Sequence, residues 1–367
     1  MDNENNLNNE NSQNNEKNIS GNPYAADKKV FSRIGFACFA VTAISTLLSV
    51  GVSLYFKYFY PEMLTSPYVT WGNQIVCMYL TAIPLGLLIL RRGKRQMELA
   101  EKPSKSNMSL GEIITTLIIC CPMMYVGSIL GSILNSFISS FGGNASTSGL
   151  EAVLSTGPLW LIFLMVVVIG PIMEEVFFRY GLIEALRPWG WKAAAWISAG
   201  IFGLFHGNLE QLFYTVFLGL LLGCVYLKTG KLRYSVIIHM SVNFFSGFIP
   251  VLIMTKFFNE EGMELLSNPD LINEILSNVE KIGEYSVLLS KVAPYMVMLL
   301  GYYGVLLGFF MAGSIIIWIY RRKFTFKPGE RKVERAAIGD TFFMAPGMMV
   351  FIITSVALMI FSAVISG

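Results

Sequence analysis

Long apolar stretches, separated by shorter polar segments, cover most of the chain after residue 30. A helix needs about 20 apolar residues to cross the hydrocarbon core of a bilayer. The stretches that reach or approach this length are Ile34–Phe56, Trp71–Leu90, Ile113–Ile138, Pro158–Leu186, Ala193–Phe205, Leu212–Leu227, Tyr234–Met254, Val292–Tyr320 and Thr341–Ser366. The pattern predicts an all-α, polytopic membrane helix bundle of eight or nine spans, of which Ala193–Phe205 is short for a full span.

Two polar segments stand apart from these stretches. Residues 1–30 are rich in Asn and acidic residues and bury too little apolar surface to fold alone, which predicts a disordered cytosolic tail. The loop 255–291 carries Leu, Ile and Val at helical spacing from Glu264 to Leu289, which predicts an amphipathic helix on the outer membrane surface. We therefore divide the chain into the tail, N-terminal membrane helices (31–109), a central core that includes this loop (110–320), and a basic loop with a last helix (321–367).

Pairs of glycines four residues apart occur in three of the apolar stretches. They are Gly127–Gly131, Gly219–Gly223 and Gly304–Gly308. Small residues at this spacing let two helix backbones approach closely within a membrane. All three pairs are therefore predicted to mark helix–helix contacts and not ligand sites.

Lys and Arg residues gather in every second segment between the apolar stretches. They precede the first stretch and follow the second, fourth, sixth and eighth: Lys28, Lys29, Arg33; Arg91, Arg92, Lys94, Arg95, Lys102, Lys105; Arg187, Lys192; Lys228, Lys231, Arg233; Arg321, Arg322, Lys323, Lys327, Arg331, Lys332 and Arg335. The segment 139–157 has none. Because positive charge marks cytosolic loops, the pattern predicts an integral protein of the plasma membrane with its N-terminus in the cytosol.

The composition excludes several classes of protein. Hydrophobic residues make up 54% of the 367 residues and charged residues 14%, against roughly 25% charged in a soluble domain. A soluble enzyme, a disordered chain and a nucleic-acid binder are excluded on this ground. The five cysteines lie in apolar runs without a CxxC pair, so they are expected to be small core residues and not disulfides or metal ligands.

Ionisable and amide side chains occur in three short segments within these apolar stretches. They are Glu174, Glu175 and Arg179, then Phe202 to His206, and then His239 to Asn243. An ionisable group at membrane depth costs roughly 2.5–3.5 kcal/mol, so it usually has a partner or a task. The chain has two histidines, His206 and His239, and both belong to this set.

The spacing of these residues predicts how they meet. Glu175 and Arg179 are one helical turn apart, the geometry of an ion pair, whereas Glu174 is rotated by about 100° and faces elsewhere. The fourth and fifth stretches form a hairpin around Pro188-Trp-Gly-Trp, and Glu174 and His206 each lie roughly 20 Å from its tip. His239 lies only roughly 9 Å into its span, so convergence requires the hairpin to project into the cytosol. We expect a polar active site where these groups meet.

The three segments resemble the motifs of the CPBP family, the membrane-embedded proteases that include the type II CAAX prenyl endopeptidases and are also called the CAAX protease or Abi family. That family shows EExxxR, FxxxH and HxxxN on successive core helices. Here the motifs read Glu174-Glu175-x3-Arg179, Phe202-x3-His206 and His239-x3-Asn243. The resemblance covers the chain from about residue 110 to 255.

The resemblance implies an intramembrane endopeptidase that cuts a membrane-associated or prenylated, CaaX-like peptide, with a cavity open toward the cytosol. It implies that Glu174 activates the attacking water together with His206. It implies that His239 and Asn243 stabilise the oxyanion, and that Glu175 and Arg179 support the site. The expected partners are membrane lipid and a peptide substrate, with no nucleic acid.

Alternatives stay open at this point. The hydrolase needs no metal, or it holds Zn²⁺ through Glu174, His206 and His239. The chain has no HExxH motif, and His239 and Asn243 make a good donor pair, which favours the metal-free version. A non-proteolytic scaffold or bacteriocin-immunity protein of the same fold is the second function considered. A transporter or channel is the third, disfavoured because the polar residues gather at one site.

Overall fold

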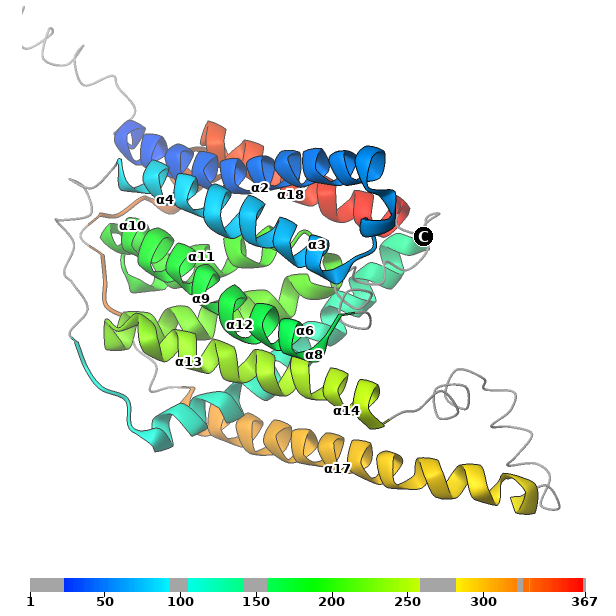
Figure 1. Ribbon diagram of the computed structural model, residues 1–367. Coiled ribbons are helices and arrows are strands. Elements are labelled where there is room, and N and C mark those ends of the chain that lie inside the picture. Colours follow the sequence, from blue (N-terminus) through cyan, green and yellow to red (C-terminus); the bar gives the residue numbers. More distant parts are fainter. Residues whose placement is uncertain are drawn as a thin grey trace, which may run out of the picture.

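The computed structural model describes residues 23–92, 105–140, 157–257, 282–321, 326–329 and 331–365, and the regular elements within them are helices (Figure 1). Each of the nine apolar stretches forms helix. Among the described residues, seven helices are long and apolar enough to cross a membrane, and two, Trp191–Phe205 and Pro346–Ser362, are shorter. The predicted all-α polytopic architecture is confirmed.

The N-terminal membrane helices begin earlier than expected. α2 spans Ala25–Phe59 and leads through a short turn to α3 (Pro67–Asn73), the π-helical segment Gln74–Ala82 and α4 (Ile83–Arg91). The prediction of a disordered tail is wrong for residues 25–30, because Phe31 lies 4.7 Å from the ring of Trp189 and Asp27 pairs with Arg331 at 2.5 Å. Residues 1–22 lie outside the described residues.

The central core contains the hairpin predicted around Pro188. One long span combines α8 (Leu159–Ile162), a π-helical segment (Phe163–Ile169), α9 (Gly170–Glu175), a second π-helical segment (Val176–Ile183) and α10 (Glu184–Leu186). A 3₁₀ turn, Arg187–Trp189, then reverses the chain into α11 (Trp191–Phe205). Gly190 has φ of 94°, a conformation that favours glycine, and its backbone packs against Gly329.

Three further helices complete the core. α6 (Leu110–Ser139) precedes the hairpin, and α12 (Leu209–Thr229) and α13 (Leu232–Asn243) follow it. α13 continues through the π-helical segment Phe244–Phe248 into α14 (Ile249–Phe257). In Figure 1 this core lies between a layer of α2, α4 and α18 on one side and α17 on the other.

The C-terminal helices differ from the prediction in their limits. α17 runs over Ile282–Tyr320, so residues 282–289 are continuous with the helix that contains the span Met296–Tyr320 and do not form a separate helix. The rest of the predicted helix Glu264–Leu289 lies outside the described residues. The ninth stretch is a π-helical turn (Gly339–Phe343) followed by α18 (Pro346–Ile365), which packs against α2 where Gly347 meets Ser32.

Two of the three glycine pairs form the predicted helix contacts. A Cβ on Gly127 would lie 2.5 Å from the Tyr214 backbone, so α6 and α12 are in close contact there. A Cβ on Gly219 would lie 2.9 Å from the Phe202 ring of α11. The prediction is wrong for Gly304 and Gly308 of α17, because no heavy atom of the described chain lies within 4 Å of a Cβ at either.

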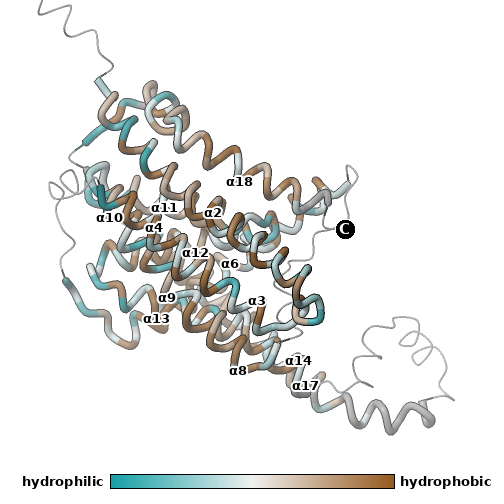
Figure 2. Tube along the Cα trace, turned by 45° about the horizontal axis from the view of Figure 1, so that its top comes forward, coloured by the Kyte–Doolittle hydropathy of each residue, from teal (hydrophilic) through white to brown (hydrophobic). Residues whose placement is uncertain are grey.

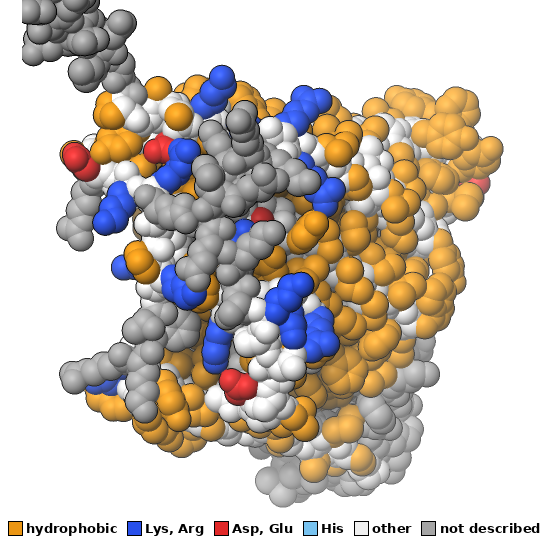
Figure 3. All heavy atoms as spheres, turned by 90° about the vertical axis from the view of Figure 1, so that its left-hand side faces the viewer, with side chains coloured by type: hydrophobic (Ala, Val, Ile, Leu, Met, Phe, Trp, Pro, Cys, Tyr) orange, Lys and Arg blue, Asp and Glu red, His pale blue; other side chains and the backbone are white. Residues whose placement is uncertain are grey.

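Polar residues concentrate at one end of the bundle. In Figure 2 the middle of the helices is mostly hydrophobic and the hydrophilic positions gather toward the ends that carry α10 and the start of α13. Figure 3 faces this end and shows Lys and Arg side chains spread over it with few acidic ones. The arrangement is what the alternation of basic segments requires, since those segments must share one side of the membrane.

Candidate active site

A cavity of about 640 Å³ lies among α6, α9, α11, α12 and α13. All four residues predicted for catalysis line it: Glu174, His206, His239 and Asn243. Phe202, the phenylalanine of the FxxxH motif, also lines the cavity. Side chains that are distant in sequence therefore meet inside an otherwise apolar bundle.

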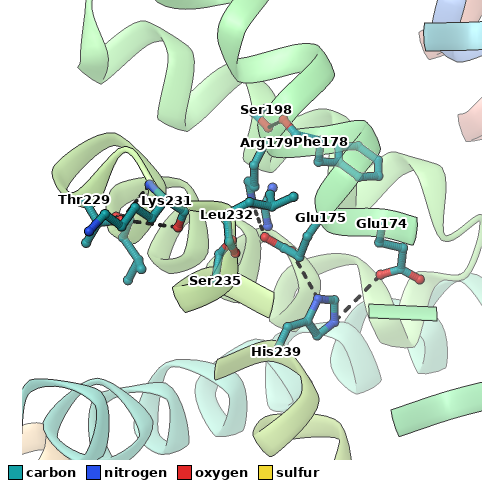
Figure 4. A network of polar contacts seen from close by, with 11 residues as sticks. Glu174, Glu175, Phe178, Arg179, Ser198, Thr229, Lys231, Leu232, Ser235 and His239 are labelled. Atoms are coloured by element: carbon teal, nitrogen blue, oxygen red, sulfur yellow. Dashed lines mark hydrogen bonds and ion pairs between the residues drawn. The ribbon is translucent and has the colours of Figure 1, made fainter. Parts of the chain in front are cut away.

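Four charged or ionisable groups form a chain that leads from the cavity wall, at Glu174 and His239, into the buried core (Figure 4). Arg179 Nε lies 2.9 Å from Glu175 Oε2, so the predicted ion pair is present, and both side chains are fully buried. The other oxygen of Glu175 lies 3.1 Å from His239 Nδ1. His239 Nε2 in turn lies 3.7 Å from Glu174 Oε2. The motif glutamates thus hold opposite sides of one imidazole.

The partner of Glu174 differs from the expectation. The spacing argument pairs Glu174 with His206, whereas the structure puts His239 at ion-pair distance from it and His206 elsewhere on the cavity wall. The reason is that His239 lies between the two glutamates, on a helix whose lateral position the spacing does not determine. Glu174 also keeps part of its surface open, with a side chain 19% exposed, whereas Glu175 is sealed.

The hydrogen bonds of the histidines determine which nitrogen carries a proton. His206 Nδ1 lies 2.8 Å from the carbonyl oxygen of Phe202, and a carbonyl only accepts, so Nδ1–H is the donor. The Nε2 atom of a neutral His206 is then a hydrogen-bond acceptor. By the same argument His239 Nδ1–H donates to the Glu175 carboxylate.

Asn243 is held by the backbone of the opposite helix. Its Nδ2 donates to the Val166 carbonyl at 2.9 Å. One of the two amide hydrogens is used by this bond, and the second is available at the cavity. Val166 lies in the π-helical segment Phe163–Ile169, and further π-helical segments begin directly after Glu175 and after Asn243. Such segments are frequent at functional sites, and the sequence pattern gave no sign of them.

Arg179 is a buried cation with incomplete hydrogen bonding. Its guanidinium carbon lies 5.3 Å from the centre of the Phe202 ring. Among the described residues, its two terminal nitrogens have no hydrogen-bond partner. The charge of Glu175 is therefore its main compensation, and removing either member would leave an unpaired charge in the core.

Sequence reasoning missed several polar residues of the cavity. They are Gln74 and Tyr79 from the second span, Ser128 and Ser132 from α6, Glu210, Gln211, Tyr214 and Thr215 from α12, and Ser246. Glu210 is the most distinctive, because it is a second carboxylate in the same cavity as Glu174. The signal that could have revealed it is the polar run Gly207-Asn-Leu-Glu-Gln directly after His206, at the start of an apolar helix.

The residues proposed as zinc ligands were Glu174, His206 and His239. Within the ranges that the structure describes, no three His, Cys, Asp or Glu side chains are arranged to hold a metal ion. The donor set does not fit a three-ligand metal site, so the chemistry below is derived from the side chains alone. The five cysteines are free thiols, as predicted.

Comparisons with known proteins point to one family. Residues 156–245, which contain all three motifs, match the family model described as type II CAAX prenyl endopeptidase Rce1-like. The chain is 30% identical over 101 residues to the protein named "Putative membrane peptidase YdiL" of Bacillus subtilis (strain 168). This match covers 27% of the chain and 41% of that relative's length. No solved structure matches. The resemblance to the type II CAAX prenyl endopeptidases, inferred from the motifs, is confirmed over the segment that carries the candidate site.

Proposed function

We propose that this protein is an intramembrane endopeptidase that hydrolyses a peptide bond of a membrane-associated substrate. The observation that carries the proposal is the set Glu174, His206, His239 and Asn243 around one cavity of about 640 Å³. A bundle without chemistry has no need to bury these groups at membrane depth. The match to an Rce1-like family model supports the same class of reaction.

In the proposed reaction, Glu174 is the general base. Its partly exposed carboxylate takes a proton from a water molecule that also donates a hydrogen bond to His206 Nε2. The water oxygen bonds to the substrate carbonyl carbon and gives a tetrahedral intermediate with a negative oxygen. Glu174 then passes its proton to the amide nitrogen, the carbon–nitrogen bond breaks, and an acid and an amine are released.

His239 and Asn243 stabilise the negative oxygen of the intermediate. The second amide hydrogen of Asn243 donates to this oxygen. His239 Nε2–H donates to the same oxygen when both nitrogens of its ring are protonated. In that state Arg179, Glu175, His239 and Glu174 alternate in sign and sum to zero charge. The gap of 3.7 Å between His239 Nε2 and Glu174 is too long for a hydrogen bond, so this donor stays free for the substrate.

Glu175 and Arg179 are positioning residues in this account. The carboxylate of Glu175 fixes the orientation of the His239 ring, and Arg179 holds that carboxylate. We propose that the protein lies in the plasma membrane with its N-terminus in the cytosol, an orientation that the alternation of basic segments supports. Prenylated or CaaX-like tails are one substrate class, suggested by the family.

The test is Glu174→Gln, with Glu112→Gln as its matched control. Both residues are helical glutamates, but Glu112 lies in the first turn of α6, where its carboxylate pairs with Lys228 at 3.3 Å. Purified full-length variants are added to membranes from cells that lack the gene, and newly formed peptide N-termini are labelled and sequenced. We expect Glu174→Gln to lower their formation by about 10²–10⁴-fold, the usual contribution of a general base.

The control should produce the same new ends as the wild type. Equal cleavage by Glu174→Gln and the wild type would refute the proposed function. A scaffold or immunity protein of the same fold predicts a different result, in which the cellular phenotype persists with Glu174→Gln at unchanged abundance and no new ends appear with either protein.

A further inference from the structure

Glu210 is a carboxylate of the cavity wall that the proposed hydrolysis does not use. It is half-buried in the first turn of α12, four residues after His206. The intervening turn is fixed by Gly207 at φ of 62° and by Asn208, whose Oδ1 accepts the Glu210 backbone N–H at 2.8 Å. A carboxylate in the first turn of a helix is stabilised by the helix dipole. Glu210 therefore places a fixed negative charge at the cavity.

α6 holds this carboxylate in place. A Cβ on Gly131 would collide with the Glu210 carbonyl, so only glycine permits this approach of the two backbones. One turn further along, Asn135 donates its Nδ2 to Glu210 Oε1 at 2.9 Å. Because a carboxylate only accepts, the amide nitrogen must face it and the amide oxygen must face away from it.

Asn135 supports Glu210 from behind the cavity wall and does not itself line the cavity. Asn135 is 2% exposed, and its Oδ1 is buried without a hydrogen-bond partner in the described part of the chain. A buried acceptor without a donor is uncommon and calls for an explanation. The hydrogen bond that Asn135 Nδ2 donates to Glu210 fixes the amide in this orientation, so Glu210 is the member of the pair that faces the cavity.

The cavity as a whole is also short of positive charge. Among its described lining side chains are the carboxylates Glu174 and Glu210 and two imidazoles, but no Lys or Arg. Ser128, Ser132 and Asn135 are spaced by four and three residues, so they share one face of α6, and the two serines extend the polar wall along the cavity. A cationic side chain thus has a polar surface between the hydrolytic groups and Glu210.

We propose that Glu210, held in place by Asn135, forms a subsite for a Lys or Arg side chain of the peptide, near the bond that is cut. The inference rests on the proposed hydrolase function. The ammonium or guanidinium donates hydrogen bonds to the Glu210 carboxylate and neutralises its charge. A free C-terminal carboxylate is repelled by the same charge. The preferred substrate therefore carries a basic residue near the bond that is cut.

The experiment measures the charge preference of cleavage. The full chain is reconstituted in liposomes of phosphatidylcholine and phosphatidylglycerol and given a pool of randomised decapeptides with blocked ends, so that Lys and Arg are the only strong cations. Products are sequenced by mass spectrometry, and cleavage near Lys or Arg is divided by cleavage near Asp or Glu. We expect Glu210→Gln to lower this ratio by about 10–100-fold, as for a lost hydrogen bond to a charged group.

Two further variants make the result specific. Glu210→Lys should invert the ratio, a change that misfolding cannot produce because it requires active protein. Glu112→Gln removes a first-turn glutamate outside the cavity and should leave the ratio as in the wild type. A matched pool with free C-terminal carboxylates should be cut more slowly near that end by the wild type.

The outcomes separate the inference from the function on which it rests. Cleavage that depends on Glu174 with a ratio unchanged by Glu210→Gln and Glu210→Lys would overturn the subsite and leave the hydrolase intact. Cleavage that is the same with Glu174→Gln as with the wild type, or no cleavage by either, would overturn the hydrolase and the subsite together.

Discussion

Two membrane spans of similar hydropathy have opposite surroundings. The spans Leu159–Trp189 and Met296–Tyr320 both contain a strongly apolar window of 18 residues, yet half of this window is buried inside the bundle in the first span and only 6% in the second. The first carries Glu174, Glu175 and Arg179, whereas the second has no charged residue. Hydropathy therefore identifies a span, but the polar residues within it show whether it faces protein or lipid.

The glycine pairs of α12 and α17 show the same difference between a buried and an exposed helix. Gly219 and Gly223 of α12 pack against the hairpin that carries the first two motifs, whereas Gly304 and Gly308 of α17 pack against nothing in the described chain. The small-residue pattern is equal in the two helices, but only one of them belongs to the core. The following predictions test this difference, beginning with the largest expected effect.

The strongest contrast is between a buried and an exposed ion pair. Arg179→Met leaves Glu175 as an uncompensated buried charge and should lower the free energy of unfolding by about 3–5 kcal/mol. Lys28→Met breaks the pair with Asp340, at 2.6 Å and partly exposed, and should cost about 0.2–1 kcal/mol. Unfolding in mixed micelles by titration with a denaturing detergent measures both. Equal losses of unfolding free energy in the two variants would contradict the expectation that the buried ion pair contributes more than the exposed one.

The second contrast lies on α13. Asn243→Ala removes the proposed oxyanion donor at the cavity and should lower kcat by about 10²–10³-fold. Ser241, two residues earlier, bonds to the Ile237 carbonyl and does not line the cavity, so Ser241→Ala should keep the wild-type rate. Cleavage rates of the Asn243→Ala and Ser241→Ala variants in the liposome assay measure both effects. A loss with both substitutions would point to damage of the helix, and a loss with neither would remove Asn243 from the mechanism.

The third contrast tests the packing of the glycines. Gly219→Leu overfills the contact with Phe202 and should cost about 1–3 kcal/mol. Gly308→Leu meets open space on α17 and should leave the unfolding free energy unchanged within error. The same titration in mixed micelles measures the two variants. Destabilisation by Gly308→Leu as large as that by Gly219→Leu would mean that α17 packs against a surface of its own.

Much of the fold was predictable because it depends on local properties of the chain. Apolar length gave the nine helices, Pro188 and Gly190 gave the turn of the hairpin, and a spacing of four residues gave the pair Glu175–Arg179. The limits of α2 and α17 were not predictable in this way. Asp27 and Phe31 are held by Arg331 and Trp189, which are distant in sequence.

The site was predictable in its members but not in its connections. The motifs gave Glu174, His206, His239 and Asn243, but spacing gives depth along a helix and not the lateral position of one helix beside another. His239 was therefore expected only in the same site, with His206 beside Glu174, and the place of His239 between both glutamates was missed. Glu210 was missed because its role depends on the approach of α6 at Gly131.

The central claim is that water reaches a polar cavity inside this bundle, and adjacent positions on α6 test it most directly. Ser128 and Ser132 line the cavity, whereas their neighbours Ile129 and Ile133 are 47% and 61% exposed on other faces of the same helix. Each is replaced by Cys and treated with a charged, water-soluble thiol reagent, with the wild-type signal of the native cysteines subtracted. Thiols react as thiolates, which form in water and not in hydrocarbon. We predict rapid labelling of Ser128→Cys and Ser132→Cys and slow labelling of Ile129→Cys and Ile133→Cys; equal rates on both faces would contradict the account.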